Sequence, residues 1–583
     1  MCIETKNVFR NFINNRILVF SLVAILAIQN LVFQITFRIN FPYSVDFTDI
    51  FTPMFDFIVN DKFTFFINKG IHVIFFPKLI SLPNLYLNSF DVVNLTYVYW
   101  IVMSLTVFVI YLIIKQTDKK LIWTIIPISA FIYSPLTTSG YFMLVMLEWY
   151  FPLLGIVSII YLFNKKTIKT KIFASSLGLA IFSTFSILLG VVSWIAGLTI
   201  LLKSFTEKKL YNKKWILLWI SSSAIIGFLY MQLTSGLSEP TRLDLLFSFI
   251  GFSFIANFLA SSFRLKYDIL MLVVGSSSIL ISFFYIWYFI KKDYLKQYFP
   301  WFVMLFTAFT GSIITALGRM HLDDHLGNEP YYSTISQLFQ IGLIFLSGKI
   351  ILESRLNSKT RKQKIIIVLL ITLIISQMIL LVPSYYSGWQ RGQYYFDEKS
   401  EVLSCYSLFV NEKCFDTLSK LASNDESLDF LAMVNYLIQN KLSIFGEKDF
   451  NSKYKITNEL SQDFEIIDNS YSLGAITHIN GINVENKSSI EIMNEIIQID
   501  GWFDQTYSNS YNVLIQINNN PLAFYDNFPV ISTVDNDLKS AHWSVSMLSG
   551  YIPDGCNSIK FSIINDKKKI DFDNDIVLCK NQT

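Results

Sequence analysis

Long apolar runs alternate with short, lysine-rich segments over residues 1–383. A helix rises about 1.5 Å per residue, so a run of about 20 apolar residues crosses the hydrocarbon part of a bilayer. Runs close to this length occur at residues 17–37, 95–114, 121–133, 141–163, 215–233, 270–290, 299–317, 333–352 and 365–381. The pattern predicts a bundle of membrane-crossing helices.

Two further apolar runs need a different interpretation. Residues 172–202 are too many for one upright helix, and Lys171 and Lys203 flank the run on sides that should both be cytoplasmic. Two short helices that form a hairpin satisfy both facts. Residues 245–260 could also cross, but a crossing there would place the lysines of residues 291–296 outside. We therefore expect a helix at the outer interface.

The distribution of lysine and arginine predicts the topology. Basic residues precede the first run and recur after alternate runs, and positive loops favour the cytoplasmic side. This rule predicts a cytoplasmic N-terminus, about eleven crossings and an extracellular or periplasmic C-terminal part. The chain is thus expected to be a multi-pass protein of the cell (plasma) membrane.

The periodicity changes after residue 383. Residues 401–445 keep helical spacing, whereas short alternating runs begin near residue 472. One of them, residues 513–517, leads into three asparagines, which is typical of a strand and a turn. The chain therefore predicts an α-helical polytopic membrane domain (1–383, with a large outer loop at 38–94), an exported, mainly helical region (384–470) and an exported β-sandwich domain (471–583).

Composition agrees with this division. Hydrophobic residues make up 52% of the 583 residues, which is too apolar for an ordinary soluble domain. Basic residues are in excess before residue 383 and acidic residues after it. Because the basic residues lie in short loops that set topology, the net charge of +3 gives no reason to expect nucleic-acid binding.

The cysteines favour disulfides in the exported part. Four of the five cysteines, Cys405, Cys414, Cys556 and Cys579, follow residue 383, and exported domains form disulfides. Proximity in the sequence favours the pairs 405–414 and 556–579. Spacing alone leaves the other pairings open.

The loop of residues 38–94 carries the first candidate site. Asp46 and Asp49 follow the first apolar run closely enough to remain near the bilayer face, where a carboxylate can accept a proton from a hydroxyl group. His72 and Lys78 lie in a second apolar stretch of the same loop. Helix capping or solvation explains the carboxylates equally well, so both interpretations stay open.

A second candidate site follows the run at residues 299–317. Four residues have the donor atoms of a divalent metal site, although a solvated loop explains them as well: His321, Asp323, Asp324 and His325. Arg319 can hold a lipid phosphate bidentately or can simply anchor a helix end at the interface. Glu148 is an acidic residue inside an apolar run, and such residues face a cavity or a partner.

No nucleophile motif, glycine-rich phosphate loop or cysteine-based zinc pattern occurs in the sequence. This argues against a hydrolase of the soluble type, a nucleotide-binding site or a redox site.

The layout resembles that of the GT-C superfamily of membrane glycosyltransferases, which includes oligosaccharyltransferases and protein mannosyltransferases. Three strings carry the resemblance. Residues 72–79 (HVIFFPKL) resemble a His-x-x-x-x-Pro-Arg/Lys segment of uncharacterised GT-C-like proteins, residues 133–149 resemble their aromatic outer loop, and Gly501-Trp502 resembles the opening of their C-terminal β domain.

The resemblance implies a GT-C-like fold that transfers a sugar from a polyprenyl-phosphate donor to a glycan or protein acceptor of the envelope. By position, the catalytic base would be Asp49 or Asp46, and Lys78 or Arg319 would neutralise the departing lipid phosphate. His72 and Glu148 would contribute to substrate binding. A divalent metal is not implied by the resemblance; His321, Asp323, Asp324 and His325 are candidate ligands for one by residue type alone. The first loop lacks an adjacent acidic pair, and the tryptophan-rich acceptor motif is missing, so the sugar and the acceptor are not implied.

A non-enzymatic envelope protein, either a glycolipid carrier or an assembly scaffold, is the alternative. In that case the same carboxylates would be structural, and membrane lipid would be the main partner. A transporter fits less well because it needs more ionisable residues at mid-membrane, where Glu148 is nearly alone.

Overall fold

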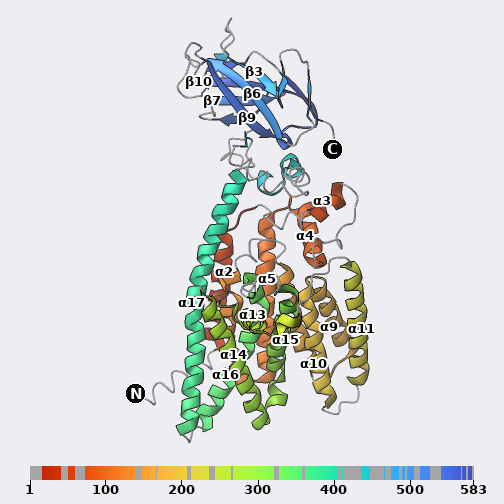
Figure 1. Cartoon of the computed structure of the whole chain (residues 1–583), viewed down its shortest axis with the longest axis vertical. Coiled ribbons are helices and arrows are strands. Elements are labelled where there is room, and N and C mark those ends of the chain that lie inside the picture. Colours follow the sequence, from red (N-terminus) through yellow and green to blue (C-terminus); the bar gives the residue numbers. More distant parts are fainter. Residues whose placement is uncertain are drawn as a thin grey trace. The chain divides into compact units, whose positions relative to one another are not determined.

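A computed structural model describes residues 16–40, 50, 52–59, 73–137, 147–165, 167–206, 212–234, 243–263, 265, 267–320, 327, 329–357, 361–404, 409–410, 435–446, 465–466, 474–484, 489–492, 496–504, 512–525, 540–565, 568–572 and 576–580. The chain forms two compact units (Figure 1). The first unit consists of Met1–Arg38, Pro42–Asn84 and Val92–Phe396, and the second of Ile39–Phe41, Leu85–Asp91 and Asp397–Thr583.

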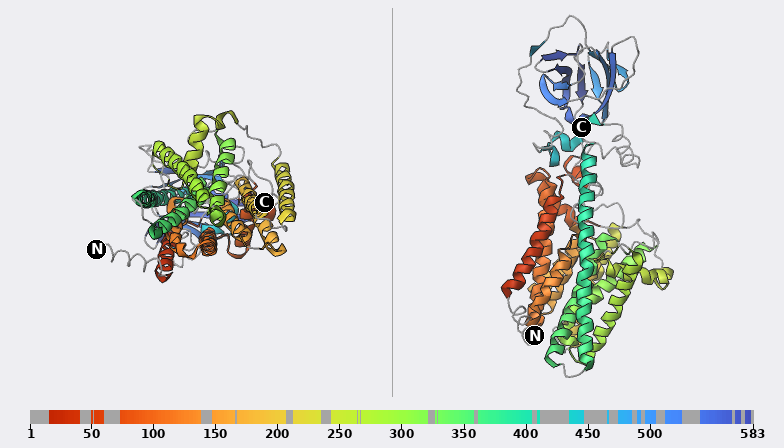
Figure 2. Two further views of the ribbon diagram at one scale, coloured as in Figure 1. Left: turned by 90° about the horizontal axis from the view of Figure 1, so that it is seen from below. Right: turned by 90° about the vertical axis from the view of Figure 1, so that its left-hand side faces the viewer.

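The first unit is helical, and its long helices run roughly parallel and antiparallel to one another (Figures 1 and 2). Two of its helices, α4 and α17, continue into the second unit. In chain order the helices are α2 (Arg16–Thr36), α3 (Thr52–Val59), α4 (Phe75–Leu87), α5 (Val92–Thr117), η2 (Lys119–Thr124), α6 (Ile125–Ile132), η3 (Pro135–Thr137), α8 (Leu147–Phe163), α9 (Thr170–Thr184), η5 (Leu188–Val191), α10 (Val192–Thr206), α11 (Asn212–Leu233), α12 (Leu243–Leu246), α13 (Phe249–Ala260), α14 (Asp268–Lys291), α15 (Leu295–Arg319), η7 (Pro330–Tyr332), α16 (Ser333–Asn357) and α17 (Arg361–Ser404).

Several helices of this unit could span a membrane, which agrees with a membrane protein. Among the described residues, six helices are long and apolar enough: Arg16–Thr36, Val92–Thr117, Lys213–Leu233, Asp268–Lys291, Leu295–Arg319 and Ser333–Glu353. The expectation of about eleven crossings, drawn from the span-length rule, is therefore wrong. Helices α6, α9 and α10, which were counted among the crossings, have only 8, 15 and 15 residues. An apolar run indicates burial in lipid or in protein, but it does not show that the helix is continuous.

The predicted helical hairpin at residues 172–202 is confirmed. Helices α9 and α10 replace a single long helix and are separated by η5. Trp194 Nε1 donates a hydrogen bond to Thr184 Oγ1 at 2.9 Å across the break. A Cβ atom at Gly190 would overlap the backbone of Ser183, so this close turn requires glycine.

Helix α6 ends among buried residues, and side chains from distant helices bind its last carbonyl groups. The final carbonyls of a helix have no partner inside the helix, and leaving them unpaired is costly away from water. Here the donors are Tyr385 Oη to the Ala130 carbonyl at 2.8 Å, Gln337 Nε2 to Phe131 at 2.9 Å, and Asn30 Nδ2 to Tyr133 at 3.0 Å. These bonds allow a short helix to end inside the bundle.

Helix α13 ends in the same way. Gln340 Nε2 donates to the Leu259 carbonyl at 3.0 Å, and Gln377 Nε2 donates to Gln340 Oε1 at 3.2 Å. Ser384 Oγ donates to the carbonyl of Phe263. Helices α16 and α17 thus hold the ends of two short helices.

The sequence pattern placed a change at residue 383, but α17 continues through Pro383 to Ser404. Proline lacks the N–H that would bind the carbonyl four residues earlier, which is that of Ile379, yet the helix remains continuous.

The second unit contains two β-sheets, which confirms the predicted β-rich C-terminal region. One sheet has the order β1-β9-β6-β3-β4, and the other has β2-β11-β10-β12-β5 with β7 and β8 added beside β10. Apolar residues of both sheets, such as Ile499 and Phe561, share one core. The strands are β1 (Phe409–Val410), β2 (Glu465–Ile466), β3 (Gly474–Ile479), β4 (Ile482–Asn483), β5 (Ile490–Ile492), β6 (Ile496–Asp504), β7 (Asn512–Ile517), β8 (Asn520–Tyr525), β9 (Ser540–Leu548), β10 (Gly555–Asn565), β11 (Lys568–Asp571) and β12 (Ile576–Lys580).

Local sequence explains parts of this β structure. Strand β7 ends before Asn518 and Asn519, which have φ angles of 49° and 64° and join β7 to β8. A two-residue loop with positive φ at both positions is a type I′ hairpin turn, and asparagine tolerates that conformation. By contrast, Phe409 and Val410 lie in the stretch expected to be helical but form strand β1, which pairs with β9.

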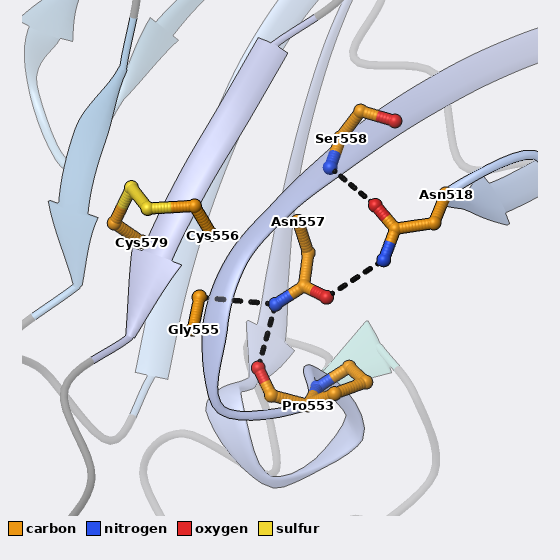
Figure 3. The surroundings of a disulfide bond; sticks show 7 residues. All are labelled: Asn518, Pro553, Gly555, Cys556, Asn557, Ser558 and Cys579. Atoms are coloured by element: carbon orange, nitrogen blue, oxygen red, sulfur yellow. Dashed lines mark hydrogen bonds between the residues drawn. A yellow bond between two sulfur atoms is a disulfide. The ribbon is translucent and has the colours of Figure 1, made fainter.

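The predicted pair Cys556–Cys579 forms a disulfide (Figure 3). The two cysteines face each other on β10 and β12. Beside them, Asn557 Nδ2 donates to the Pro553 carbonyl at 2.7 Å, and Asn518 Nδ2 donates to Asn557 Oδ1 at 2.9 Å. Cys405 and Cys414 lie outside the described residues.

Candidate functional site

Three of the predicted site residues, Lys78, Glu148 and Arg319, lie in the described part of the chain. The others, namely Asp46, Asp49, His72, His321, Asp323, Asp324 and His325, lie outside it. Within the described ranges no group of three or more His, Cys, Asp or Glu residues is placed to hold a metal ion.

Glu148 and Arg319 occupy favourable helix ends. Glu148 lies in the first turn of α8 and is 7% exposed. Arg319 is the last residue of α15. The N-terminus of a helix stabilises a negative charge and the C-terminus a positive one, so each group lies at the helix end that suits its charge.

Aromatic rings pack between these two helix ends. We define the aromatic cluster as Trp149, Tyr331, Tyr332 and Phe258. The centroid of the Trp149 ring lies 5.1 Å from that of Tyr331 and 5.7 Å from that of Tyr332. The rings of Tyr331 and Tyr332 are 4.7 Å apart, and Phe258 lies 5.0 Å from Tyr332. The cluster thus joins the start of α8, the turn η7 before α16, and α13.

The charges of Glu148 and Arg319 both act on this cluster. Burial raises the pKa of Tyr331, the negative charges of Glu329 and Glu148 raise it further, and the positive charge of Arg319 opposes the rise. Burial also raises the pKa of Tyr332, and Arg319 again opposes that rise. Two residues that are far apart in the sequence therefore lie within electrostatic range of one pair of tyrosines.

Glu148 also connects this cluster to the start of α4. It interacts electrostatically with Tyr230, whose hydroxyl accepts a hydrogen bond from the Val73 N–H at 3.0 Å. The Phe75 N–H donates to the Phe185 carbonyl at 2.9 Å. These two bonds anchor the start of α4 next to Tyr230. Lys78 lies on the first turn of this helix and is 1% exposed.

The stems of the first loop belong to the second unit. The Ser443 N–H donates to the Ser89 carbonyl at 2.8 Å, and the Ile444 N–H donates to the Asn40 carbonyl at 2.9 Å. Ser443 Oγ also donates to the Asn40 carbonyl, at 2.5 Å. A single turn, η8 (Ser443–Gly446), thus holds both ends of the loop in which Asp46 and Asp49 occur.

The arrangement provides two kinds of recognition. An arginine can bind a phosphate with two parallel hydrogen bonds, and a carboxylate can accept hydrogen bonds from hydroxyl groups. The aromatic cluster supports these two groups, because Trp149, Tyr332 and Phe258 are only 7%, 2% and 0% exposed and pack against one another. A phosphorylated, hydroxyl-rich ligand matches the two polar groups.

The tyrosines of this site were not predicted from the sequence. Tyr331 and Tyr332 lie just before the apolar run at residues 333–352 and look like ordinary interface residues. The adjacent Pro330 was a usable signal, because a proline before two aromatic residues at a helix start marks a rigid turn.

No protein-family model, no curated protein and no solved structure matches this chain. The class of protein is therefore defined by its own structure: a chain with several membrane-length apolar helices and a β unit that contains a disulfide.

Proposed function

We propose that this protein is a membrane glycosyltransferase of GT-C type, which transfers a sugar from a polyprenyl-phosphate donor to an envelope acceptor on the outer face of the cell membrane. One observation supports the proposal most. Arg319 and Glu148, two charged groups at the ends of apolar helices, both act on the aromatic cluster. An ionisable group within an apolar membrane segment is costly and usually marks a functional site.

In the proposed reaction an acceptor hydroxyl attacks the anomeric carbon of the sugar. The bond between that carbon and the phosphate oxygen breaks, and its electron pair leaves with the phosphate. Arg319, with Lys78, neutralises the charge that develops on the phosphate. Asp49 or Asp46 accepts the proton of the acceptor hydroxyl. Glu148 accepts hydrogen bonds from hydroxyl groups of the sugar.

The proposed orientation has the N-terminus in the cytoplasm and the second unit outside. Hydrogen bonds from Gln297 to the Thr117 carbonyl and from Lys203 to the Lys296 carbonyl bring the end of α5, the end of α10 and the start of α15 together. Lysines gather at this basic end: Lys115, Lys119, Lys120, Lys165, Lys203, Lys291, Lys292, Lys296 and Lys349. The positive-inside rule assigns this end to the cytoplasm.

One feature supports an outer location for the opposite helix ends, and another supports an outer location for the second unit. Glu148 and Asp268 lie in the first turns of α8 and α14 at these opposite ends, whereas the basic end has lysines. The Cys556–Cys579 disulfide of the second unit is typical of an oxidising compartment.

Sugar transfer can be tested with the full chain reconstituted in liposomes with polyprenyl-phosphate sugars and envelope acceptors. The wild-type protein should release free polyprenyl phosphate and glycosylate an acceptor. Arg319→Gln should lower the rate by about 100-fold, the typical effect of removing one preorganised electrostatic group, and Asp49→Asn or Asp46→Asn should identify the base.

Arg38→Gln is the matched control, because Arg38 is also an arginine at a helix end and donates to Tyr97 Oη at 3.0 Å. Its rate should equal that of the wild type. Lipid-linked sugar that binds but is never transferred would favour the alternative of a glycolipid carrier or scaffold. Unchanged envelope glycans in a deletion strain would refute the transferase proposal.

A further inference from the structure

A cavity of about 430 Å³ lies between helices α10, α14, α15 and α16 of the first unit. Its lining is almost entirely apolar, and the principal lining residues are Phe283, Ile286, Phe299, Phe302, Phe306 and Phe309. On α15 these residues recur every three or four positions, so they form one face of that helix. Such a surface binds hydrocarbon and offers little to a polar ligand.

The cavity opens on helix faces that meet the surroundings of the bundle. Phe283 and Phe306 are 60% and 48% exposed, and both lie on helices long and apolar enough to span a membrane. In a bilayer, lipid chains cover such faces. A recess among these residues is therefore accessible to a lipid chain from the side.

One end of the cavity is positively charged. Thr199 lines the cavity, and Lys203 follows it one turn later on the same face of α10. The Lys203 ammonium donates to the Lys296 carbonyl and lies 5.1 Å from the centroid of the Phe299 ring, which also lines the cavity. The apolar lining and the basic rim of the cavity thus meet at Phe299.

The turn between α14 and α15 adds further positive charge. Lys291, Lys292 and Lys296 are exposed there, and Asp293 is the single acidic residue between the two helices. Lys291 also lies 5.1 Å from the centroid of the Trp287 ring. The rim of the cavity therefore carries an excess of positive charge at the basic end of the bundle.

We propose that this cavity is a binding site for an anionic phospholipid. Its acyl chain lies along Phe302, Phe306 and Phe309, and its phosphate lies at Lys203 and Lys296. Basic rims between membrane helices bind anionic head groups, and each nearby lysine adds to the attraction. The site lies at the start of α15, whereas Arg319 lies at its end, so it does not depend on the proposed glycosyl transfer.

Native mass spectrometry of the full chain, purified in detergent with added phosphatidylglycerol or phosphatidylcholine, tests the proposal. The wild type should retain phosphatidylglycerol in preference. The double variant Lys203→Gln/Lys296→Gln should bind it about 30-fold more weakly, because two interfacial charges are lost. Thr199→Phe fills the cavity and should abolish retention while leaving the lysines in place.

Lys119→Gln/Lys120→Gln is the matched control. These two lysines are exposed at η2, at the same basic end, whereas Lys203 lies against the Phe299 ring that lines the cavity. Equal retention of the two lipids by the wild type, or equal losses in the test and control variants, would overturn the proposal. Displacement of the lipid by inorganic phosphate would also overturn it, because the acyl chain would then contribute nothing.

Discussion

Replacing both Cys556 and Cys579 by serine removes the covalent link between β10 and β12 but keeps their hydrogen-bonded register. The two cysteines are 23 residues apart in sequence. Closing a loop of that length restricts the unfolded chain by about 3.4 kcal/mol of conformational free energy at 25 °C. The second unit should lose up to that amount of stability, which is about a 300-fold change in its unfolding equilibrium.

Hydrogen exchange of the full chain in detergent, read by mass spectrometry, measures this change. Slowly exchanging amides of β6, β9 and β10 lie in the core strands of the second unit, and they exchange through unfolding of that unit. Their exchange should accelerate by up to about 300-fold in the double variant. Wild-type protein treated with a reducing agent should behave in the same way.

Amides of α16, in the first unit, are the internal control and should exchange as in the wild type. Acceleration below about threefold in the core strands would refute the loop-entropy argument. Equal acceleration in α16 would show that the two units do not unfold separately.

Three further outcomes follow from the first unit. Gln340→Leu removes the donor to the Leu259 carbonyl and should lower the free energy of unfolding by about 1 kcal/mol in detergent titrations. Gln390 is exposed, so Gln390→Leu is the control and should leave that free energy unchanged. Equal unfolding midpoints for the two variants would contradict the capping role. Gly190→Ala should lower the thermal midpoint by the equivalent of about 1–3 kcal/mol, because the new Cβ overlaps the backbone of Ser183. Gly178→Ala should leave the midpoint unchanged, because its Cβ meets no atom within 4 Å. Similar midpoints for the two variants would contradict the requirement for glycine at the turn. The folded protein favours the protonated form of Tyr331, whose pKa is raised, so this contribution to stability is present below about pH 10 and is lost as pH rises through the folded pKa. Tyr331→Phe should therefore flatten the fall in unfolding free energy at alkaline pH. An unchanged slope would contradict the assignment.

Local patterns predicted much of the fold. The lysines around residues 172–202 indicated a hairpin because both clusters favour the cytoplasmic side of the membrane. The asparagines at 518 and 519 identified a turn because few residues accept positive φ. The length of each membrane helix was less predictable. Helix α6 ends where it does because Tyr385, 255 residues away, binds its carbonyl, and no local pattern contains that partner.

The candidate site was predictable only in part. Glu148 and Arg319 were predictable as site residues because a charge in or next to an apolar run is costly. Tyr331 and Tyr332 were not predictable, since aromatic residues are common at helix starts near a membrane surface. Only the packing of α8 against the turn before α16 brings the tyrosines to the two charges.

The capping of α6 by a much later residue has a consequence for biosynthesis. At about 5–20 residues per second, the ribosome needs roughly 10–50 s to extend the chain by the 255 residues between Ala130 and Tyr385. During that interval the Ala130 carbonyl depends on water or on the insertion machinery for its hydrogen bond. Chains that stall before α17 therefore carry an unfinished helix end, which gives cellular quality control a feature by which to distinguish incomplete chains from finished ones.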